Sequence, residues 1–137
     1  ISGMTLATGR GHLVLAVVQG IAAQIAELAS AIGADARAPL SRLRVDGGLT
    51  RSTVLMQAVA DILQLPVDVY PSPHATALGA AALAQLSLTP DRGLRAVVGP
   101  WVPAATFEPQ WDAARAEEFR CSWRELAATT YRPQGLS

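Results

Sequence analysis

Cysteine and histidine are scarce in this chain, and lysine is absent. The one cysteine, Cys121, cannot form a disulfide within the chain. The two histidines, His12 and His74, do not form a cluster with it at the spacing that zinc sites use. The sequence therefore supports neither a disulfide framework nor a zinc centre. A single unpaired cysteine is typical of a reducing compartment, so we expect a cytoplasmic protein.

Excess charge and long hydrophobic runs are also missing. Eleven basic residues balance eleven acidic residues, whereas proteins that bind nucleic acid or a membrane surface normally carry a basic excess. No uninterrupted apolar run reaches the roughly eighteen residues of a membrane span, and no basic segment followed by an apolar core opens the chain. We therefore expect no nucleic-acid partner, no membrane span and no secretion signal.

Half of the 137 residues are apolar, which is enough for one hydrophobic core and too few for two. We expect one domain over residues 1–137. The chain begins Ile1-Ser2-Gly3 without a methionine, and the first helical pattern starts about ten residues later. We therefore expect a fragment of a longer protein, without its N-terminal domain.

The first third of the chain predicts a long helix. Residues 12–32 carry apolar side chains three and four positions apart, and Gly33 is the expected stop. The apolar stripe is wide, so we expect this helix to be buried on more than one side.

A strand, a helix and a second strand are predicted next. Leu43-Arg44-Val45 alternates apolar and charged residues, and residues 67–70 (VDVY) favour a strand. Between them lies a helix with Thr50 or Ser52 as its N-cap. The core face of this helix would consist of Leu55, Val59, Ile62 and Leu63.

The second half predicts two more helices. Residues 76–86 are rich in alanine, with Gly79 inside, so we expect this helix to be buried. Residues 88–107 predict a loop with a short extended piece. Residues 110–131 predict a terminal helix whose packed face holds Phe119, Trp123 and Leu126. This order is α/β, and the crossover after the first strand is long enough for a parallel neighbour.

The most informative segment is the corner where the first strand meets two glycines and a helix. Gly47 and Gly48 lack side chains, so they can adopt left-handed backbone angles and let a ligand touch the main chain. The N-terminus of the following helix offers N–H donors that suit a phosphate. Such a corner is more often only a tight turn. It is neither a P-loop nor a dinucleotide fingerprint, because the lysine of the first and the third glycine of the second are missing.

The other polar candidates are expected to have structural roles. Asp46 is expected to cap the turn rather than bind a metal or nucleotide, and Asp61 to face solvent or cap locally. Ser52 has no histidine to activate it as a nucleophile. Cys121 is expected to pack rather than react. The ring of His12 is expected to find a partner at the helix start, and His74 lies in a proline-rich loop without a catalytic pattern.

The glycine corner and its surroundings resemble the C-terminal domain of the FGGY family of carbohydrate kinases. The matching segments occur in the family's order and spacing: RVDGG at 44–48, LMQ at 55–57, ADIL at 60–63, PV at 66–67 and TALGAA at 76–81. Residues 3–5 (GMT) and 107–109 (FEP) are similar too, so the resemblance covers nearly the whole chain. It implies an actin-like (ribonuclease H-like) α/β ATPase fold, of which this chain is the C-terminal half.

The resemblance also implies roles for individual residues. Gly47 and Gly48 would lie against the phosphates and ribose of a nucleotide, and Ser52 would face the adenine, where glycerol kinases typically have asparagine. The cofactors would be ATP and Mg²⁺. The family's catalytic aspartate, polyol pocket and N-terminal phosphate motif precede the segment that Ile1 begins. We therefore expect no catalytic residue in this chain and no kinase activity from it alone.

The expected partners are ATP or ADP, the missing N-terminal domain and, in the whole enzyme, a small polyol or sugar; a homo-oligomer stays open. Glycerol is the preferred substrate, because residues 46–48 and 55–57 look closer to glycerol kinases than to xylulokinases. Xylulose, gluconate or another sugar stays open. Two alternatives compete with a kinase. The first is a non-catalytic actin-like module, favoured by Ser52 and by the unfamiliar residues 85–105. The second is a plain α/β domain whose corner binds nothing.

Overall fold

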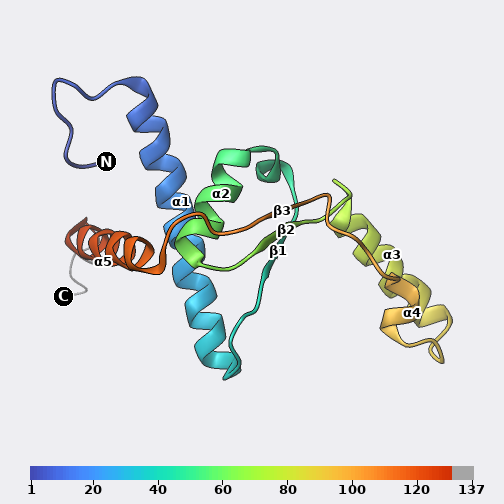
Figure 1. Cartoon of the computed structure of the whole chain (residues 1–137). Coiled ribbons are helices and arrows are strands. Elements are labelled where there is room, and N and C mark those ends of the chain that lie inside the picture. Colours follow the sequence, from blue (N-terminus) through green and yellow to red (C-terminus); the bar gives the residue numbers. More distant parts are fainter. Residues whose placement is uncertain (131–137) are drawn as a thin grey trace, which may run out of the picture.

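The computed structural model describes residues 1–130, which form a helix-rich α/β fold with a small sheet (Figure 1). The predicted α/β order is confirmed. The elements in chain order are α1 (Arg10–Ala36), β1 (Leu43–Val45), the 3₁₀ turn η1 (Gly48–Arg51), α2 (Thr53–Leu63), β2 (Val67–Val69), α3 (Ala75–Leu88), α4 (Leu94–Val98), β3 (Ala105–Phe107) and α5 (Ala113–Thr130).

The sheet has the order β1-β2-β3. β1 and β2 are parallel, with Val45 opposite Val69, so the expected parallel neighbour is confirmed. β3 runs antiparallel on the other side of β2, with Phe107 opposite Val67. α2 forms the crossover from β1 to β2, and the two strands therefore end at the same edge of the sheet.

The core lies where α1, α2 and β2 meet. The predicted face of α2 is confirmed. On α1, the buried positions are alanines, whose small side chains let the two helices approach closely. The main core residues are Ala22, Ala26, Ala29, Leu55, Met56, Val59, Ala60, Ile62, Leu63, Val67 and Val69.

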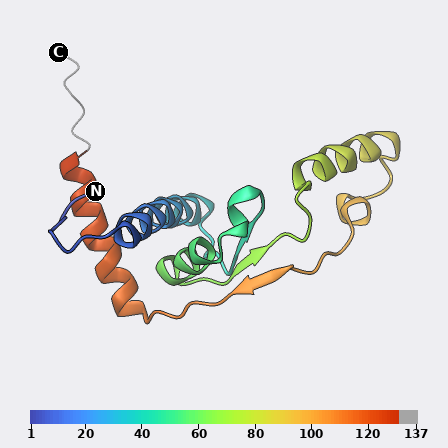
Figure 2. The same cartoon turned by 90° about the horizontal axis from the view of Figure 1, so that it is seen from above.

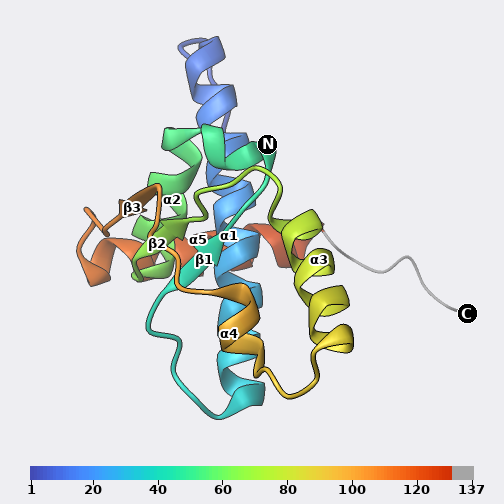
Figure 3. The same cartoon turned by 90° about the vertical axis from the view of Figure 1, so that its right-hand side faces the viewer.

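The first helix differs from its prediction in two ways. Gly33 does not stop it, because α1 continues to Ala36 and ends at Arg37, whose φ of 50° is left-handed. The expected burial on several sides is wrong as well. α1 is longer than α2 and projects beyond it at its N-terminal end (Figure 3), where Val14, Leu15 and Val17 are exposed.

By length and composition only, α1 is long enough and apolar enough to cross a membrane. The core helix of a soluble protein passes the same test, so this observation is weak.

Glu27, near the middle of α1, receives a hydrogen bond of 3.0 Å from Arg124 of α5 and lies 3.6 Å from the guanidinium of Arg120. The hydrogen bond from Arg124 holds the pKa of Glu27 below its ordinary value. These contacts join α1 to α5.

α3 and α4 pack against each other and stand away from the body formed by α1, α2 and α5 (Figure 2). The prediction that α3 is buried is wrong for the described residues, because none of its side chains is buried. Gly79 faces open space, and Leu78 and Leu83 are exposed. The predicted loop at 88–107 contains α4, which was not foreseen, while β3 is the expected extended piece.

The terminal helix is confirmed as α5, although Tyr131 of the predicted range lies outside the described residues. Phe119 packs against the core and meets Trp111 edge to face, with the ring centroids 5.8 Å apart. Trp123 is half-buried and Leu126 is exposed, so the expected packed face is only partly covered.

Asp61 corrects a prediction, because its side chain is buried rather than facing solvent. Its Oδ1 accepts hydrogen bonds from Gln57 Nε2 at 2.9 Å, from the Gln110 N–H at 2.6 Å and from the Trp111 N–H at 3.3 Å. The last two groups belong to the segment that leads into α5. One carboxylate on α2 therefore fixes where the terminal helix begins.

We expect the substitution Asp61→Ala to lower the free energy of unfolding by about 1–3 kcal/mol, because it leaves two backbone N–H groups without their acceptor. Urea unfolding followed by circular dichroism measures this. Asp91→Ala, at an exposed loop residue, is the control and should stay within about 0.5 kcal/mol of the wild type. Equal effects of the two substitutions would contradict the assigned role of Asp61.

A second buried carboxylate, Asp68, holds the sheet together from the middle of β2. It forms an ion pair with Arg42, just before β1, and accepts a hydrogen bond of 2.8 Å from the hydroxyl of Thr106 in β3. The hydrogen bond from Arg42, followed by that from Thr106, holds the pKa of Asp68 below its ordinary value. The ionised form of Asp68 therefore stabilises the fold.

This lowered pKa predicts a loss of stability in acid. The contribution of Asp68 is complete above the ordinary carboxyl pKa of about 3.9 and is lost as the pH falls through the lowered folded-state value. We expect the urea midpoint of the wild type to fall more steeply between about pH 5 and pH 2 than that of Asp68→Asn, which has no carboxyl at this position. Parallel curves for the two proteins would exclude Asp68 as a source of acid sensitivity.

Candidate functional site: the glycine corner

The candidate site is the glycine corner between β1 and α2. Gly47 has φ of 96° and ψ of 179°, a conformation that side chains disfavour. The hydroxyl of Thr50 donates a hydrogen bond of 2.7 Å to the carbonyl of Gly47, which also accepts the Thr50 N–H at 3.2 Å. The expectation of left-handed angles is thus confirmed for Gly47. It is wrong for Gly48, whose φ is not positive.

Gly48 differs from Gly47 because the fold leaves room for a side chain there. A Cβ built on Gly48 meets no atom within 4 Å. Glycine at this position is therefore required neither by backbone angle nor by packing within the described residues. Its main chain is open to any molecule that approaches the corner.

Ser52 is the N-cap of α2, which decides between the two predicted caps. Its backbone is extended, and its hydroxyl oxygen accepts a hydrogen bond of 3.3 Å from the Leu55 N–H. The Ser52 carbonyl accepts the Met56 N–H at 3.0 Å. Ser52 therefore sets the position at which α2 begins, directly after the corner.

A hollow of about 400 Å³ opens beside the two glycines. One wall follows β1 and the other follows β2, because parallel strands bring their carboxyl ends to one edge of the sheet. Gly47 and Gly48 lie together in this hollow, while Ser52 is not among the lining residues. The full lining is Gly47, Gly48, Thr50, Arg51, Tyr70, Pro71, Ser72 and Pro73.

The second wall of the hollow, which follows β2, was not predicted from the sequence. Tyr70 directly follows β2, and its N–H donates a hydrogen bond of 2.8 Å to the Val45 carbonyl at the end of β1. The sequence did contain the information needed, because two strands predicted to be parallel neighbours bring the residues that follow them close together.

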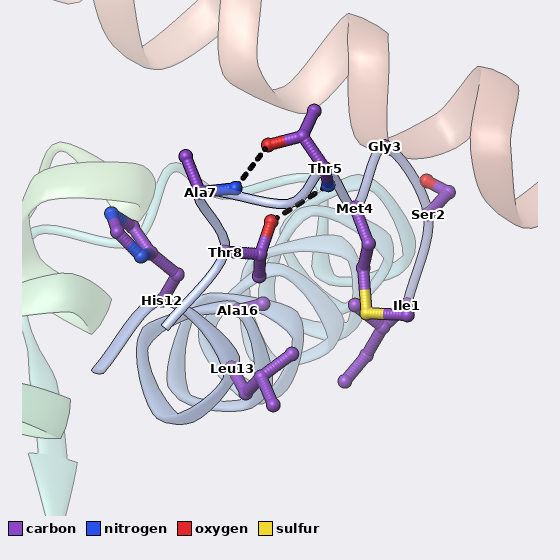
Figure 4. Close-up of a pocket in the computed structure, with 10 residues that line it drawn as sticks. All are labelled: Ile1, Ser2, Gly3, Met4, Thr5, Ala7, Thr8, His12, Leu13 and Ala16. Carbon is purple, nitrogen blue, oxygen red and sulfur yellow. Dashed lines mark hydrogen bonds between the residues drawn. The ribbon is translucent and has the colours of Figure 1, made fainter. Parts of the chain in front are cut away.

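A different hollow of about 330 Å³ lies where the N-terminal segment folds over the start of α1 (Figure 4). The side chains of Ile1 and Met4 lie on one side of it, and His12 lies on the other. His12 Nδ1 accepts a hydrogen bond of 3.1 Å from the Gly9 N–H, so its ring is satisfied as expected. The hollow has no charged side chain that would suggest a reaction.

The remaining candidates do not join the glycine corner in a reactive group. Within residues 1–130 the carboxylate of Asp46 makes no hydrogen bond or ion pair, so the expected turn-capping role is wrong and Thr50 closes the turn instead. His74 is exposed at the start of α3. Cys121 is exposed rather than packed, and its hydrogen bond to Glu117 raises the pKa of the thiol, which disfavours the reactive thiolate.

Comparison with known proteins places the chain in a family. The family model described as "FGGY family of carbohydrate kinases, C-terminal domain" matches residues 1–88. The chain belongs to the FGGY family of carbohydrate kinases. The resemblance noted in the sequence is thereby confirmed. The match includes the glycine corner, α2, β2 and α3.

Individual FGGY kinases agree with this assignment. The chain is 45% identical over 123 residues to glycerol kinase of Bordetella parapertussis, covering 90% of this chain and 24% of that protein. The structure of Plasmodium falciparum glycerol kinase with ADP matches with a TM-score of 0.80 and 30% identity, over 96% of this chain and 26% of the other. Xylulose kinase from Rhodospirillum rubrum matches with a TM-score of 0.74 and 30% identity, over 93% and 26%.

These comparisons confirm the expected actin-like kinase fold class. The chain spans about a quarter of the length of the FGGY kinases that it matches.

The cap at Ser52 gives a testable prediction about the corner. Ser52→Ala should lower the free energy of unfolding by about 1 kcal/mol, because the Leu55 N–H loses its acceptor, while Ser52→Asn should retain most of the stability. Urea midpoints measure both. Ser41→Ala, at an exposed position outside any helix, is the control. If Ser52→Ala matches the control, the cap does not stabilise α2.

Proposed function

We propose that this chain is the nucleotide-binding C-terminal part of an ATP-dependent kinase that phosphorylates a hydroxyl of a small polyol or sugar. The observation that carries the proposal is the open backbone at Gly48, beside a hollow at the carboxyl edge of parallel strands. Crevices at this edge are the usual ligand sites of open α/β sheets.

The corner suits the ribose and phosphate portion of ATP or ADP. Gly47 and Gly48 allow a ligand to approach the main chain without a side chain in between. Arg51 adds a positive charge to the lining of the same hollow. Ser52 stands at the start of α2, where we place the adenine. Its hydroxyl oxygen already accepts one hydrogen bond from the main chain, and the hydroxyl proton stays available for a ring nitrogen.

Phosphoryl transfer needs a positioned acceptor hydroxyl, a metal ion and groups that stabilise the transferred phosphate. Within residues 1–130 no group of three His, Cys, Asp or Glu could hold a metal, and Asp46 is the carboxylate that directly precedes the corner. We assign the base, the acceptor pocket and the metal ligands to the rest of the kinase.

The rest of the kinase is also the partner that we propose for the exposed apolar faces. Val14, Leu15 and Val17 on α1 and Leu78 and Leu83 on α3 are exposed, although these helices carry few charges. Contiguous exposed apolar surface often marks an interface. This arrangement fits a chain that spans a quarter of the relatives' length. We propose that the whole enzyme is cytoplasmic.

Glycerol is the substrate that we propose, because the curated relatives at 35–45% identity are named glycerol kinases. A sugar such as xylulose is the second candidate. It is favoured by the xylulose kinase structure, which matches at the same 30% identity as the glycerol kinase structure.

Calorimetric titration of the chain with ATP and ADP tests the proposal. We expect binding to the wild type and a loss of at least about tenfold in affinity, or about 1.4 kcal/mol, in Gly48→Val. The fold has room for this side chain, whereas a ligand would clash with it. Gly79→Val on α3 is the matched control, since its Cβ also meets open space but lies away from the corner.

An equal affinity of wild type and Gly48→Val would place the nucleotide elsewhere. A wild-type chain that binds neither nucleotide would contradict the proposed function of the isolated corner.

A further inference from the structure

Three side chains, one in β1 and two in the segments next to β2 and β3, form an aromatic and cationic cluster at the edge that holds the glycine corner. Tyr70 follows β2, Trp101 precedes β3 and Arg44 lies in β1. The rings of Tyr70 and Trp101 meet edge to face, with centroids 5.1 Å apart and planes at 62°. The guanidinium carbon of Arg44 lies 5.0 Å from the centre of the Trp101 ring, within the range of a cation–π contact.

Backbone hydrogen bonds hold this cluster in place. The Tyr70 N–H donates to the Val45 carbonyl at 2.8 Å, which ties Tyr70 to β1. The Ala104 N–H donates to the Val69 carbonyl at 2.9 Å, which brings the segment with Trp101 beside the end of β2. The position of the Tyr70 ring is therefore set by all three strands.

Tyr70 lies between two hollows. On one side it lines the hollow of about 400 Å³ that contains Gly47 and Gly48. On the other side it lines a hollow of about 370 Å³ together with Arg44 and Trp101. Tyr70 is half-buried, and its ring packs on Trp101, while the residue also lines the hollow that contains the glycines.

We propose that Tyr70 is a nucleotide-binding residue of the corner and that Trp101 is the positioning residue that holds it. The inference rests on the proposed function and adds an aromatic side chain to a site that already includes the glycine backbone, Arg51 and Ser52. The phenol hydroxyl donates a hydrogen bond to an oxygen of the ribose or phosphates, and the ring forms the wall opposite Gly47 and Gly48. Tyrosine suits this position, because it combines an apolar body with a polar tip.

The experiment compares ADP affinities of the chain and its variants by calorimetry. Tyr70→Phe removes only the hydroxyl and should weaken binding about two- to tenfold. Tyr70→Ala removes the wall as well and should weaken binding by more than about tenfold. Trp101→Ala should weaken binding, whereas Trp101→Phe keeps a ring in contact with Tyr70 and should restore most of the affinity. Thermal unfolding of each variant checks that it is folded.

Tryptophan fluorescence gives a second readout that a purely structural role would not change. The chain has three tryptophans, and Trp101 is the one in contact with Tyr70. ADP should change the fluorescence of the wild type. It should also change that of Trp123→Phe, which lacks only the tryptophan on α5. The change should disappear in Trp101→Phe, even though that variant still binds ADP.

The outcomes separate the two proposals. If Gly48→Val abolishes binding while Tyr70→Ala binds like the wild type, the role of Tyr70 is overturned and the proposed function stands. If Trp101→Ala binds normally, or if Trp101→Phe keeps the full fluorescence change, the positioning role of Trp101 is overturned. A wild-type chain that binds no nucleotide overturns the proposed function and this inference together.

Discussion

The parallel pairing of β1 with β2 is the constraint on which the candidate site depends. The two strands are in register from Leu43 to Val45, and the hydrogen bond from the Tyr70 N–H to the Val45 carbonyl extends this register past the end of β2. A parallel pair requires a crossover that packs back on the sheet, and here the crossover is α2. The packing of α2 on the alanines of α1 therefore also fixes how the glycine corner faces the residues after β2.

The two glycines of the corner are glycines for different reasons. At Gly47 the backbone conformation itself requires the residue, since its φ of 96° would strain any side chain. At Gly48 neither backbone angle nor neighbouring atoms require it. The sequence alone does not distinguish the two positions, because glycine is typical of a turn at either one. The structure separates them, because only at Gly48 does the fold leave the choice of glycine unexplained, and the proposed ligand contact is placed there.

Features determined by neighbours in the sequence were predictable, while features determined by distant segments were not. The buried face of α2 and its N-cap depend on side chains within one or two helical turns; the face was predicted, and Ser52 was one of the two predicted caps. Asp61 looked like a surface residue, because its partners at Gln110 and Trp111 lie far along the chain. The same limit applies to the site. Its glycines are visible in the sequence, but Tyr70 joins them only through strand pairing.

The chemistry of the corner explains why binding and reaction would be divided in the proposed kinase. The hollow offers open backbone, an aromatic side chain and the charge of Arg51, which suit the proposed nucleotide but include no base that would remove a proton from an acceptor hydroxyl. A nucleotide held from one side keeps its other side in water. If the rest of the proposed kinase can cover that side, the bound nucleotide favours the covered arrangement over the uncovered one, by the difference in nucleotide affinity between the two. Covering the nucleotide would then tighten its binding by the same factor.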